Sequence, residues 1–464
     1  MTYFFETYGC QMNKAESAAL EQVLVQRGWN ACETVESADL VVINTCSVRA
    51  TAESRIYGRL GWFAALKAVR GGAKDAKGTS FPVAAQCHAK GQRQLVLVVT
   101  GCMAQRLLDS FKKQYPVIDY VVGNFQKQHF DQIVQAVEKG ESLACVEEEP
   151  VYSFAPSSWE HGAFSAFIPI MHGCNNFCTY CIVPYVRGRE VSRHPKEILA
   201  ELDQLSSRQV KEITLLGQNV NSYEHKLEDG SVLAFPSLMQ EIANHLRATK
   251  SSIKWVRFMS SHPKDLSDKL IDVISKEDVF CRHIHLPVQH GSNDVLHRMN
   301  RKYTREYYLD LVNRIRLKIP DVSLTTDILI GFPGETEDDF GQTKSLMEEI
   351  RYQAAYMYYY NPREGTPAAT YPEQVPLETK KTRLQHIIDM QLEITRQETE
   401  KRVGKTVMVL AETVSRDNPD ELLGRTEQDD RVVFAAPKSL CGSFVQVQLL
   451  ELTGNTIRGI LKST

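Results

Sequence analysis

The chain lacks the features that mark membrane-bound and exported proteins. None of its 464 residues lies in an uncharged apolar run of about 18 residues, the length that a membrane-spanning helix requires. The N-terminus, MTYFFETYGCQMNK, lacks the basic segment followed by an apolar segment that a secretory signal peptide has. Internal repeats and low-complexity tracts are also missing. We therefore expect a soluble, cytoplasmic protein that does not contact a membrane.

The chain also has no large excess of either charge sign. Its 54 Lys and Arg residues against 57 Asp and Glu residues give a formal net charge of -3. Charge alone therefore neither indicates nor excludes a nucleic-acid partner. The length predicts two to four domains and excludes a single small binding module.

The first part of the chain alternates short apolar runs with amphipathic stretches, which predicts a parallel α/β domain over residues 1–140. Asn13 and Asn124 stand where helix N-caps are expected, and Gly28 stands near a helix end. The composition of residues 69–93 predicts a surface excursion within this domain. The predicted strands are 2–10, 39–46, 94–102 and 118–123, and the predicted helices are 13–29, 47–69 and 124–139.

An acidic, Pro- and Ser-rich linker at 147–163 predicts a domain boundary. Strands then recur at intervals that suit βα units, and six units predict a partial (β/α)6 barrel over 158–398, with its active face at the carboxyl ends of the strands. The predicted strands are 164–171, 212–218, 255–261, 283–289, 323–332 and 354–361, and the predicted helices include 195–205, 264–275, 304–317 and 336–350. A long charged helix is expected over 377–402, followed by a small β-barrel domain over 400–464.

Three cysteines, Cys174, Cys178 and Cys181, follow the first strand of the central domain with the spacing CxxxCxxC. Three thiolates leave one iron of a four-iron cluster free, unlike the four-cysteine sites of electron carriers. One helix face would also explain the spacing, but Gly173, Asn175, Asn176 and Thr179 are poor helix formers. Structural zinc usually takes four side chains. The pattern therefore favours an iron–sulfur cluster.

A second set, Cys10, Cys46 and Cys102, occupies equivalent positions, each at the carboxyl end of a predicted parallel strand. Such ends share one edge of an α/β sheet, so we expect the three thiols to converge there and bind a second cluster. Buried free cysteines are the alternative. The remaining cysteines share no such position and are taken as structural or surface residues: Cys32, Cys87, Cys145, Cys281 and Cys441.

The CxxxCxxC motif with Tyr180 before its last cysteine resembles that of the radical S-adenosylmethionine (SAM) superfamily. That resemblance implies that SAM binds the free iron and that polar residues at the other strand ends contact it. Each of these residues could instead be a turn former or cap. The candidates are Gln218, Asn219, Ser260, Ser261, His262, Gln289, His290 and the segment from Gly331 to Glu335.

The two cysteine sets together resemble those of the methylthiotransferase branch of radical SAM enzymes, and the resemblance covers nearly the whole chain. It implies a C-terminal TRAM domain and favours the tRNA-modifying MiaB group through TYGCQMN around Cys10. Further matching motifs are NTCSVR at 44–49, GCMAQR at 101–106, LLGQNVNSY at 215–223, SSHP at 260–263 and LPVQHGS at 286–292. The segment near 70–93 is longer than in typical members.

This resemblance implies a methylthio group added to carbon 2 of isopentenyl-adenosine beside the tRNA anticodon. The cofactors would be SAM and two [4Fe-4S] clusters that face one cavity: the cluster on Cys174, Cys178 and Cys181 cleaves SAM, and the other carries sulfur. The partners would be the anticodon stem-loop and an electron donor such as flavodoxin or ferredoxin. Two alternatives are another methylthiotransferase substrate, namely threonylcarbamoyl-adenosine or a ribosomal-protein aspartate, and a non-catalytic two-cluster RNA-binding regulator.

Arginines are the candidate RNA contacts. Arg187, Arg189 and Arg193 follow the cysteine loop, and Arg425 and Arg431 lie in the β domain. They are candidates for phosphate binding, although a solvated charged face explains them equally well. The aromatic run from Tyr356 to Tyr360 could stack on a base or pack in the barrel.

Overall fold

The computed structural model describes residues 1–47, 50–70, 94–141, 143, 152–154, 162–259, 261–454 and 456–462. Nearly all of the predicted excursion at 69–93 and most of the predicted linker at 147–163 lie outside the described residues. The chain divides into two compact units. The first comprises Met1–Glu160, His172–Asn175 and Ile182–Val191, and the second comprises His161–Met171, Asn176–Cys181 and Ser192–Thr464. Within the described ranges, no helix is long and apolar enough to cross a bilayer.

The first unit is a parallel five-stranded sheet with the order β2-β1-β3-β4-β5. Helices follow β1, β3, β4 and β5, as the alternating pattern predicts. Its strands are β1 (Thr2–Thr7), β2 (Asn30–Ala31), β3 (Leu40–Thr45), β4 (Val96–Gly101) and β5 (Tyr120–Val122). Its helices are α1 (Gln11–Gln26), α2 (Ala50–Arg70), α4 (Cys102–Gln114) and α5 (Phe130–Lys139).

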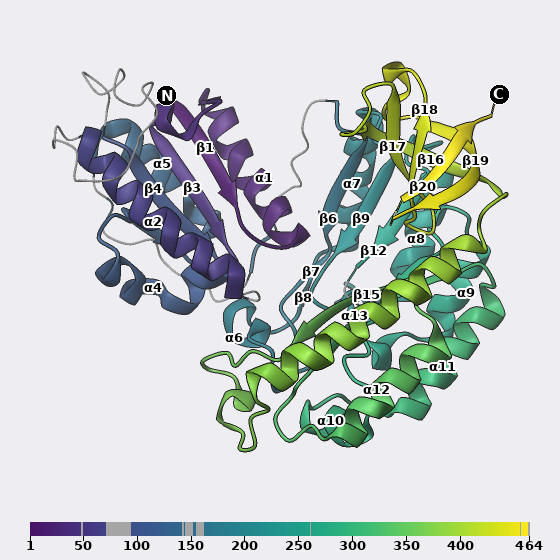
Figure 1. Cartoon of the computed structure of the whole chain (residues 1–464). Helices are drawn as coiled ribbons and strands as arrows, with labels where there is room; N and C mark the ends of the chain where they lie inside the picture. The colour runs from purple at the N-terminus through teal and green to yellow at the C-terminus, as the bar shows by residue number, and fades with distance from the viewer. Residues whose placement is uncertain are drawn as a thin grey trace. The chain divides into compact units, whose positions relative to one another are not determined.

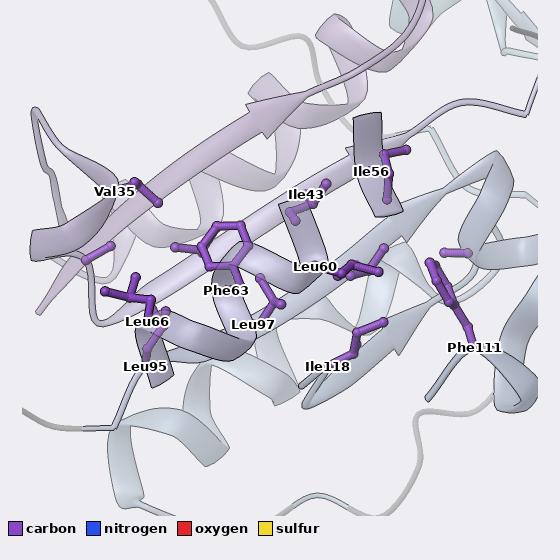
Figure 2. Close-up of a cluster of buried hydrophobic side chains, with 14 of the residues drawn as sticks. Val35, Ile43, Ile56, Leu60, Phe63, Leu66, Leu95, Leu97, Phe111 and Ile118 are labelled. Carbon is purple, nitrogen blue, oxygen red and sulfur yellow. The ribbon is translucent and has the colours of Figure 1, made fainter. Parts of the chain in front are cut away.

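The centre of the sheet is buried on both faces, because β3 and β4 are mostly apolar and almost every residue in them is buried. Ile43 of β3 packs in one cluster with side chains of α2 and α4 (Figure 2), and Val41 belongs to the same cluster. Leu40 and Val42 instead belong to the cluster that includes side chains of α1 and α5. Successive side chains of a strand point to opposite faces. The continuous apolar run in β3 therefore supplies both cores of a three-layer α/β/α unit (Figure 1).

Two predicted helix caps are wrong. Cys10, not Asn13, is the N-cap of α1, and Asn13 is the third helical residue, whose side chain accepts a hydrogen bond from the Cys10 amide. Asn124 lies five residues before His129, the N-cap of α5. Gly28 does follow the end of α1, with a φ of 77° that suits glycine. Both asparagine side chains instead donate hydrogen bonds to residues outside the helices that they were expected to cap.

The second unit contains the six predicted strands as two parallel three-stranded sheets, with orders β12-β9-β6 and β13-β14-β15. The partial barrel is thus confirmed. The strands are β6 (Ser165–Pro169), β9 (Glu212–Leu216), β12 (Trp255–Phe258), β13 (His283–His285), β14 (Ser323–Ile330) and β15 (Ala354–Tyr359). One short pair accompanies them, β10 (Glu224–Lys226) with β11 (Val232–Ala234). A further short pair, β7 (Met171–His172) with β8 (Val191–Ser192), has one residue of each strand in each unit.

Helices connect these strands and lie outside the sheets (Figure 1). They are α7 (Pro195–Ser207), α8 (Phe235–Ala248), α9 (Asp268–Lys276), α10 (Asn293–Arg298), α11 (Arg305–Lys318), α12 (Glu337–Ile350) and α13 (Leu377–Glu400). The predicted long helix is α13, and it lies beside β15, since Thr395 donates a hydrogen bond to the Gln353 carbonyl. A short helix, α6 (Val183–Arg187), follows the cysteine loop and belongs to the first unit.

The C-terminal strands close into a small barrel with the order β16-β17-β18-β20-β19. Val409, Phe434 and Val447 lie in its buried core. The strands are β16 (Thr406–Val414), β17 (Glu421–Thr426), β18 (Arg431–Ala435), β19 (Phe444–Thr453) and β20 (Thr456–Leu461).

A buried ion-pair network joins this small barrel to the amino ends of β9 and β12. Glu212, 2% exposed, accepts hydrogen bonds of 2.8 Å from Arg257 of β12 and 2.8 Å from Arg425 of β17. Arg257 also donates to the carbonyl of Thr426, the last residue of β17, and to that of Glu427 in the turn that follows. The small barrel therefore contacts β9 and β12 away from their carboxyl ends, which Gln218 and Ser261 follow.

Replacing Glu212 with alanine is expected to lower the free energy of unfolding by about 3–5 kcal/mol, because buried Arg257 and half-buried Arg425 lose their shared carboxylate. Differential scanning calorimetry would measure this as a fall of several degrees in the main transition. Exposed Glu228 offers a matched control, with an expected change within about 0.5 kcal/mol. A transition unchanged in both variants would contradict the role given to the network.

Candidate functional site

The second cysteine set lies at the carboxyl ends of three adjacent strands. Thr7 of β1 pairs with Asn44 of β3, and Thr45 of β3 pairs with Gly101 of β4. Cys46 and Cys102 each follow one of these paired residues, and Cys10 follows the end of β1. Neighbouring strands lie about 4.8 Å apart, so the three cysteines lie after adjacent strand ends at one edge of the sheet. The strand order reverses between β1 and β3, the point where α/β sheets of this order bind ligands.

Close backbone contacts hold these strand ends together. Gly101 has a φ of 96°, and a Cβ atom there would lie 2.3 Å from the Thr45 carbonyl oxygen, so only glycine fits. Asn13 donates hydrogen bonds to the Asn44 side chain, 2.9 Å, and to the Thr45 carbonyl, 3.1 Å. The same Asn13 accepts hydrogen bonds from the amide and the thiol of Cys10. Asn13 therefore ties the Cys10 turn to the Cys46 turn.

Arg187 of α6 lies against the third cysteine. Its Nε donates to the Cys102 sulfur at 3.3 Å, and its Nη1 donates to Glu16 at 2.7 Å. Lys127 donates to the other oxygen of Glu16 at 2.6 Å. Arg187 is 3% exposed and Glu16 is 5% exposed. The sulfur of Cys102 thus faces a buried network of two cations and one carboxylate.

The charges of this network suit an anionic sulfur. Burial would raise the pKa of Glu16, but Arg187 and Lys127 lower it well below its ordinary value, so the carboxylate is ionised. Burial would lower the pKa of Arg187, but Cys102 and Glu16 raise it well above its ordinary value. Burial and Arg187 lower the pKa of His172, which keeps that ring neutral. Arg187, Lys127 and Glu16 together carry one net positive charge, which a thiolate that ligates a cluster would balance.

The CxxxCxxC segment is a loop, as its poor helix formers predict. Phe177 has a φ of 47°, and the Cys174 amide donates to the Gly188 carbonyl. Thr179 bonds the backbone of Met299 and Arg298 at the end of α10. The boundary between the two compact units passes through this loop, with Cys174 in the first unit and Cys178 and Cys181 in the second.

A second buried arginine lies beside this loop. Arg301 donates to the Cys178 sulfur at 3.4 Å and to the Tyr180 hydroxyl at 3.5 Å. Its other donors bond the Tyr303 hydroxyl and the Pro287 carbonyl, which are neutral. Each cysteine set therefore has one sulfur that accepts a hydrogen bond from a buried guanidinium, a contact that favours the anionic form of sulfur.

None of the nine cysteines within the described residues is in a disulfide, so both predicted sets keep the thiol chemistry of ligands. In the same residues, no three His, Cys, Asp or Glu side chains are placed to hold one metal ion. Cysteines around a four-iron cluster each bind a different iron, so they lie farther apart than ligands of a single ion. The donor chemistry of both sets fits such a cluster.

The candidate cofactor residues that follow β9 and β12 lie in two loops joined by hydrogen bonds. The Asn219 side chain donates to Asp265 and accepts from the His262 amide, so it joins the two strand-end loops. Ser261 and His262 are 4% and 5% exposed, and the Ser261 hydroxyl and the His262 Nε2 have no hydrogen-bond partner in the described structure. Buried polar atoms of this kind are expected to bond a ligand. Gln218 is half-buried, and Ser260 lies outside the described residues.

The candidates after β13 and β14 form a second buried group. Glu335 accepts hydrogen bonds from the Phe332 amide and from Arg383, and it lies 3.3 Å from His290. Both carboxylate oxygens of Glu335 therefore already accept hydrogen bonds from the protein. Gln289 and Gly331 have positive φ values of 71° and 67°. Gln289 forms a parallel bridge with Ile328 of β14, and Gly331 directly follows β14.

Most of the candidate RNA-binding arginines are held in internal ion pairs. Arg187 pairs with Glu16, Arg193 is 5% exposed and pairs with Glu201, and Arg425 pairs with Glu212. Arg189 and Arg431 are exposed. A phosphate contact therefore suits only these last two.

Sequence patterns alone missed Glu16, Lys127 and Arg301. For Glu16 a signal existed, because it lies four residues from both Met12 and Leu20 on the buried face of α1. A charged residue in such an apolar stripe indicates a buried partner. Arg301 follows α10 in an ordinary polar turn, which gives no comparable signal.

Three family models match separate parts of the chain. The Radical SAM superfamily matches residues 168–347, the uncharacterized protein family UPF0004 matches residues 2–123, and the TRAM domain matches residues 400–462. Among solved structures, the radical S-adenosylmethionine methyltransferase TsrM from Kitasatospora setae is similar, with a TM-score of 0.57 and 13% identity. The match covers 79% of this chain and 75% of TsrM, and it shows the fold alone.

Three similar curated proteins match over nearly their whole length, and each is named tRNA-2-methylthio-N(6)-dimethylallyladenosine synthase. Those of Treponema pallidum (strain Nichols) and Treponema denticola are each 49% identical, covering 99% of this chain and 99% and 100% of their own. That of Bacteroides fragilis (strain YCH46) is 43% identical over 98% of this chain and 94% of its own. The chain therefore belongs to the tRNA-2-methylthio-N(6)-dimethylallyladenosine synthase family of radical SAM methylthiotransferases.

Proposed function

We propose that this chain adds a methylthio group to carbon 2 of the adenine ring in isopentenyl-adenosine beside the tRNA anticodon. The carrying observation is the full-length match to synthases of this name in a chain with two sets of three cysteines. The enzyme uses SAM and [4Fe-4S] clusters. Three thiolates per set leave an iron open for a second ligand, which four thiolates would not.

We assign one cluster to Cys174, Cys178 and Cys181, and the other to Cys10, Cys46 and Cys102. A three-cysteine cluster supplies, when bound, a low-potential electron and an open iron site. Arg301 and Arg187 hold the sulfurs of Cys178 and Cys102 by hydrogen bonds of 3.4 and 3.3 Å. We place SAM at the carboxyl ends of the barrel strands, where Ser261 and His262 offer unpartnered polar atoms.

The target carbon explains why no acid or base residue is assigned. The C2–H bond of adenine offers no acidic proton, so general acid–base catalysis would contribute little. The chain must instead present the base in the barrel, and splaying a base from an RNA loop is common in RNA recognition. Tyr356 and Tyr358 of β15 are 49% and 42% exposed and are our candidates for stacking on it.

We infer that the RNA partner is the anticodon stem-loop, with Arg189 and Arg431 as candidate phosphate contacts. A flavodoxin or ferredoxin would supply the electrons, and a tRNA substrate places the reaction in the cytoplasm.

Deletion of the gene is expected to remove methylthio-isopentenyl-adenosine from bulk tRNA, with an equal gain in isopentenyl-adenosine. Liquid chromatography with mass spectrometry of the digested nucleosides measures both. The wild-type gene should restore the modification, and a gene carrying Cys46→Ala should not.

An unchanged level of methylthio-isopentenyl-adenosine in the deletion strain would overturn the proposed substrate. If the methylthio form of threonylcarbamoyl-adenosine disappeared instead, the substrate would be that nucleoside. A purified, reduced protein that made no 5′-deoxyadenosine from SAM would overturn the enzyme assignment.

A further inference from the structure

Arg187 is six residues from Cys181 in sequence, yet its guanidinium contacts a cysteine of the other set. Its Nε donates to Cys102 at 3.3 Å, while Nη1 and Nη2 donate to the two oxygens of Glu16 at 2.7 and 3.3 Å. These residues all belong to the first compact unit. The segment that supplies ligands to one proposed cluster thus also supplies a cation to a ligand of the other.

We propose that Arg187 is a positioning residue that orients the Cys102 sulfur and raises the reduction potential of the cluster on Cys10, Cys46 and Cys102. This role rests on the proposed function, since it requires a cluster on these three cysteines.

The hydrogen bonds of Arg187 fix the plane of its guanidinium. A bidentate pair with a carboxylate sets the orientation of the group, and Glu16 is itself held by Lys127 at 2.6 Å. The side chain of Arg187 is 3% exposed, so any rotation would leave a buried charge without its partner. The remaining Nε–H of Arg187 is therefore fixed in the direction of Cys102, and its hydrogen bond orients the Cys102 sulfur.

The charges around Cys102 determine the sign of the effect. Reduction of a cluster adds one negative charge, so a nearby cation stabilises the reduced form and a nearby anion destabilises it. Arg187 and Glu16 contact each other but carry opposite charges. Loss of the arginine should therefore lower the reduction potential, and loss of the charge on Glu16 should raise it.

The test uses full-length protein carrying Cys174→Ala, Cys178→Ala and Cys181→Ala, so that only the second cluster can form. Arg187→Met, Arg187→Lys or Glu16→Gln is then introduced into this triple-alanine protein, and each variant is reconstituted anaerobically. Redox titration followed by electron paramagnetic resonance measures the potential, and iron and sulfide analysis measures cluster content. Arg193→Met is the matched control, because Arg193 is 5% exposed and pairs with Glu201 without contacting a cysteine.

We expect Arg187→Met to lower the reduced-to-oxidised ratio at a fixed potential about tenfold, a shift of about 59 mV for one electron. Arg187→Lys keeps the charge and should shift the ratio less, Glu16→Gln should shift it the opposite way, and Arg193→Met should not shift it. Because Glu16→Gln is nearly isosteric, its result stands even if Arg187→Met folds poorly.

Shifts of equal sign for Arg187→Met and Glu16→Gln, or no shift in Glu16→Gln, would overturn the electrostatic role. A background protein that binds no iron would overturn both this role and the assignment of the second cluster, whereas iron binding without potential shifts would overturn the role alone.

Discussion

Replacement of Cys46 by alanine is expected to abolish methylthio insertion while 5′-deoxyadenosine formation stays within about twofold of wild type. The two activities separate because SAM cleavage depends on the other three cysteines, and three ligands are needed for each cluster. Incubation of reduced protein with SAM and isopentenyl-adenosine tRNA, followed by chromatography of both products, measures the two activities together. Iron content should fall by about half.

Cys32 supplies the matched control for this variant. It lies in the same unit, and its thiol donates to the Tyr3 carbonyl rather than facing the strand ends. Cys32→Ala should leave both activities and the iron content unchanged. Equal loss of both activities in Cys46→Ala would show that the two cysteine sets do not divide the work as proposed.

Replacement of Cys178 by alanine is expected to abolish both SAM cleavage and methylthio insertion. Cys178 is 7% exposed and accepts the hydrogen bond of Arg301, so the variant loses a ligand and leaves a buried guanidinium without one acceptor. The same assay measures both activities, and an iron content near half of wild type would show that the second cluster persists.

Cys281 provides the control here, since it is 2% exposed and burial raises the pKa of its thiol, which keeps it protonated. Cys281→Ala should preserve both activities at a small cost in stability, about 1 kcal/mol for a lost core sulfur. SAM cleavage that survived in Cys178→Ala would remove that cysteine from the ligand set.

Strand periodicity and turn residues predicted most of the fold. The apolar runs of β3 and β4 and the spacing of the βα units identify the parallel sheets, because buried strands and connecting helices leave different repeats in the sequence. The shared edge of three cysteine-bearing strands also follows from sequence alone. The pairing of Thr45 with Gly101, which places Cys46 and Cys102 on neighbouring strands, needed the three-dimensional register.

The contacts between distant residues could not be predicted in this way. Arg187 was a reasonable phosphate ligand when only its neighbours in sequence were known, yet Glu16, 171 residues away, takes up its charge. Asn13 was a reasonable N-cap, yet its side chain bonds Asn44, 31 residues away. Local preference identifies what a side chain can bind, whereas tertiary packing decides which partner is present.

The network of Glu212, Arg257 and Arg425 changes how truncation experiments should be interpreted. A protein cut after α13 would lose the guanidinium of Arg425 and the two carbonyls that Arg257 bonds, leaving a carboxylate and an arginine at the base of the barrel in altered surroundings. Impaired catalysis in such a fragment would then report a damaged barrel as much as a missing tRNA contact. Point substitutions of exposed residues of the small barrel, for example Arg431, would separate the two effects.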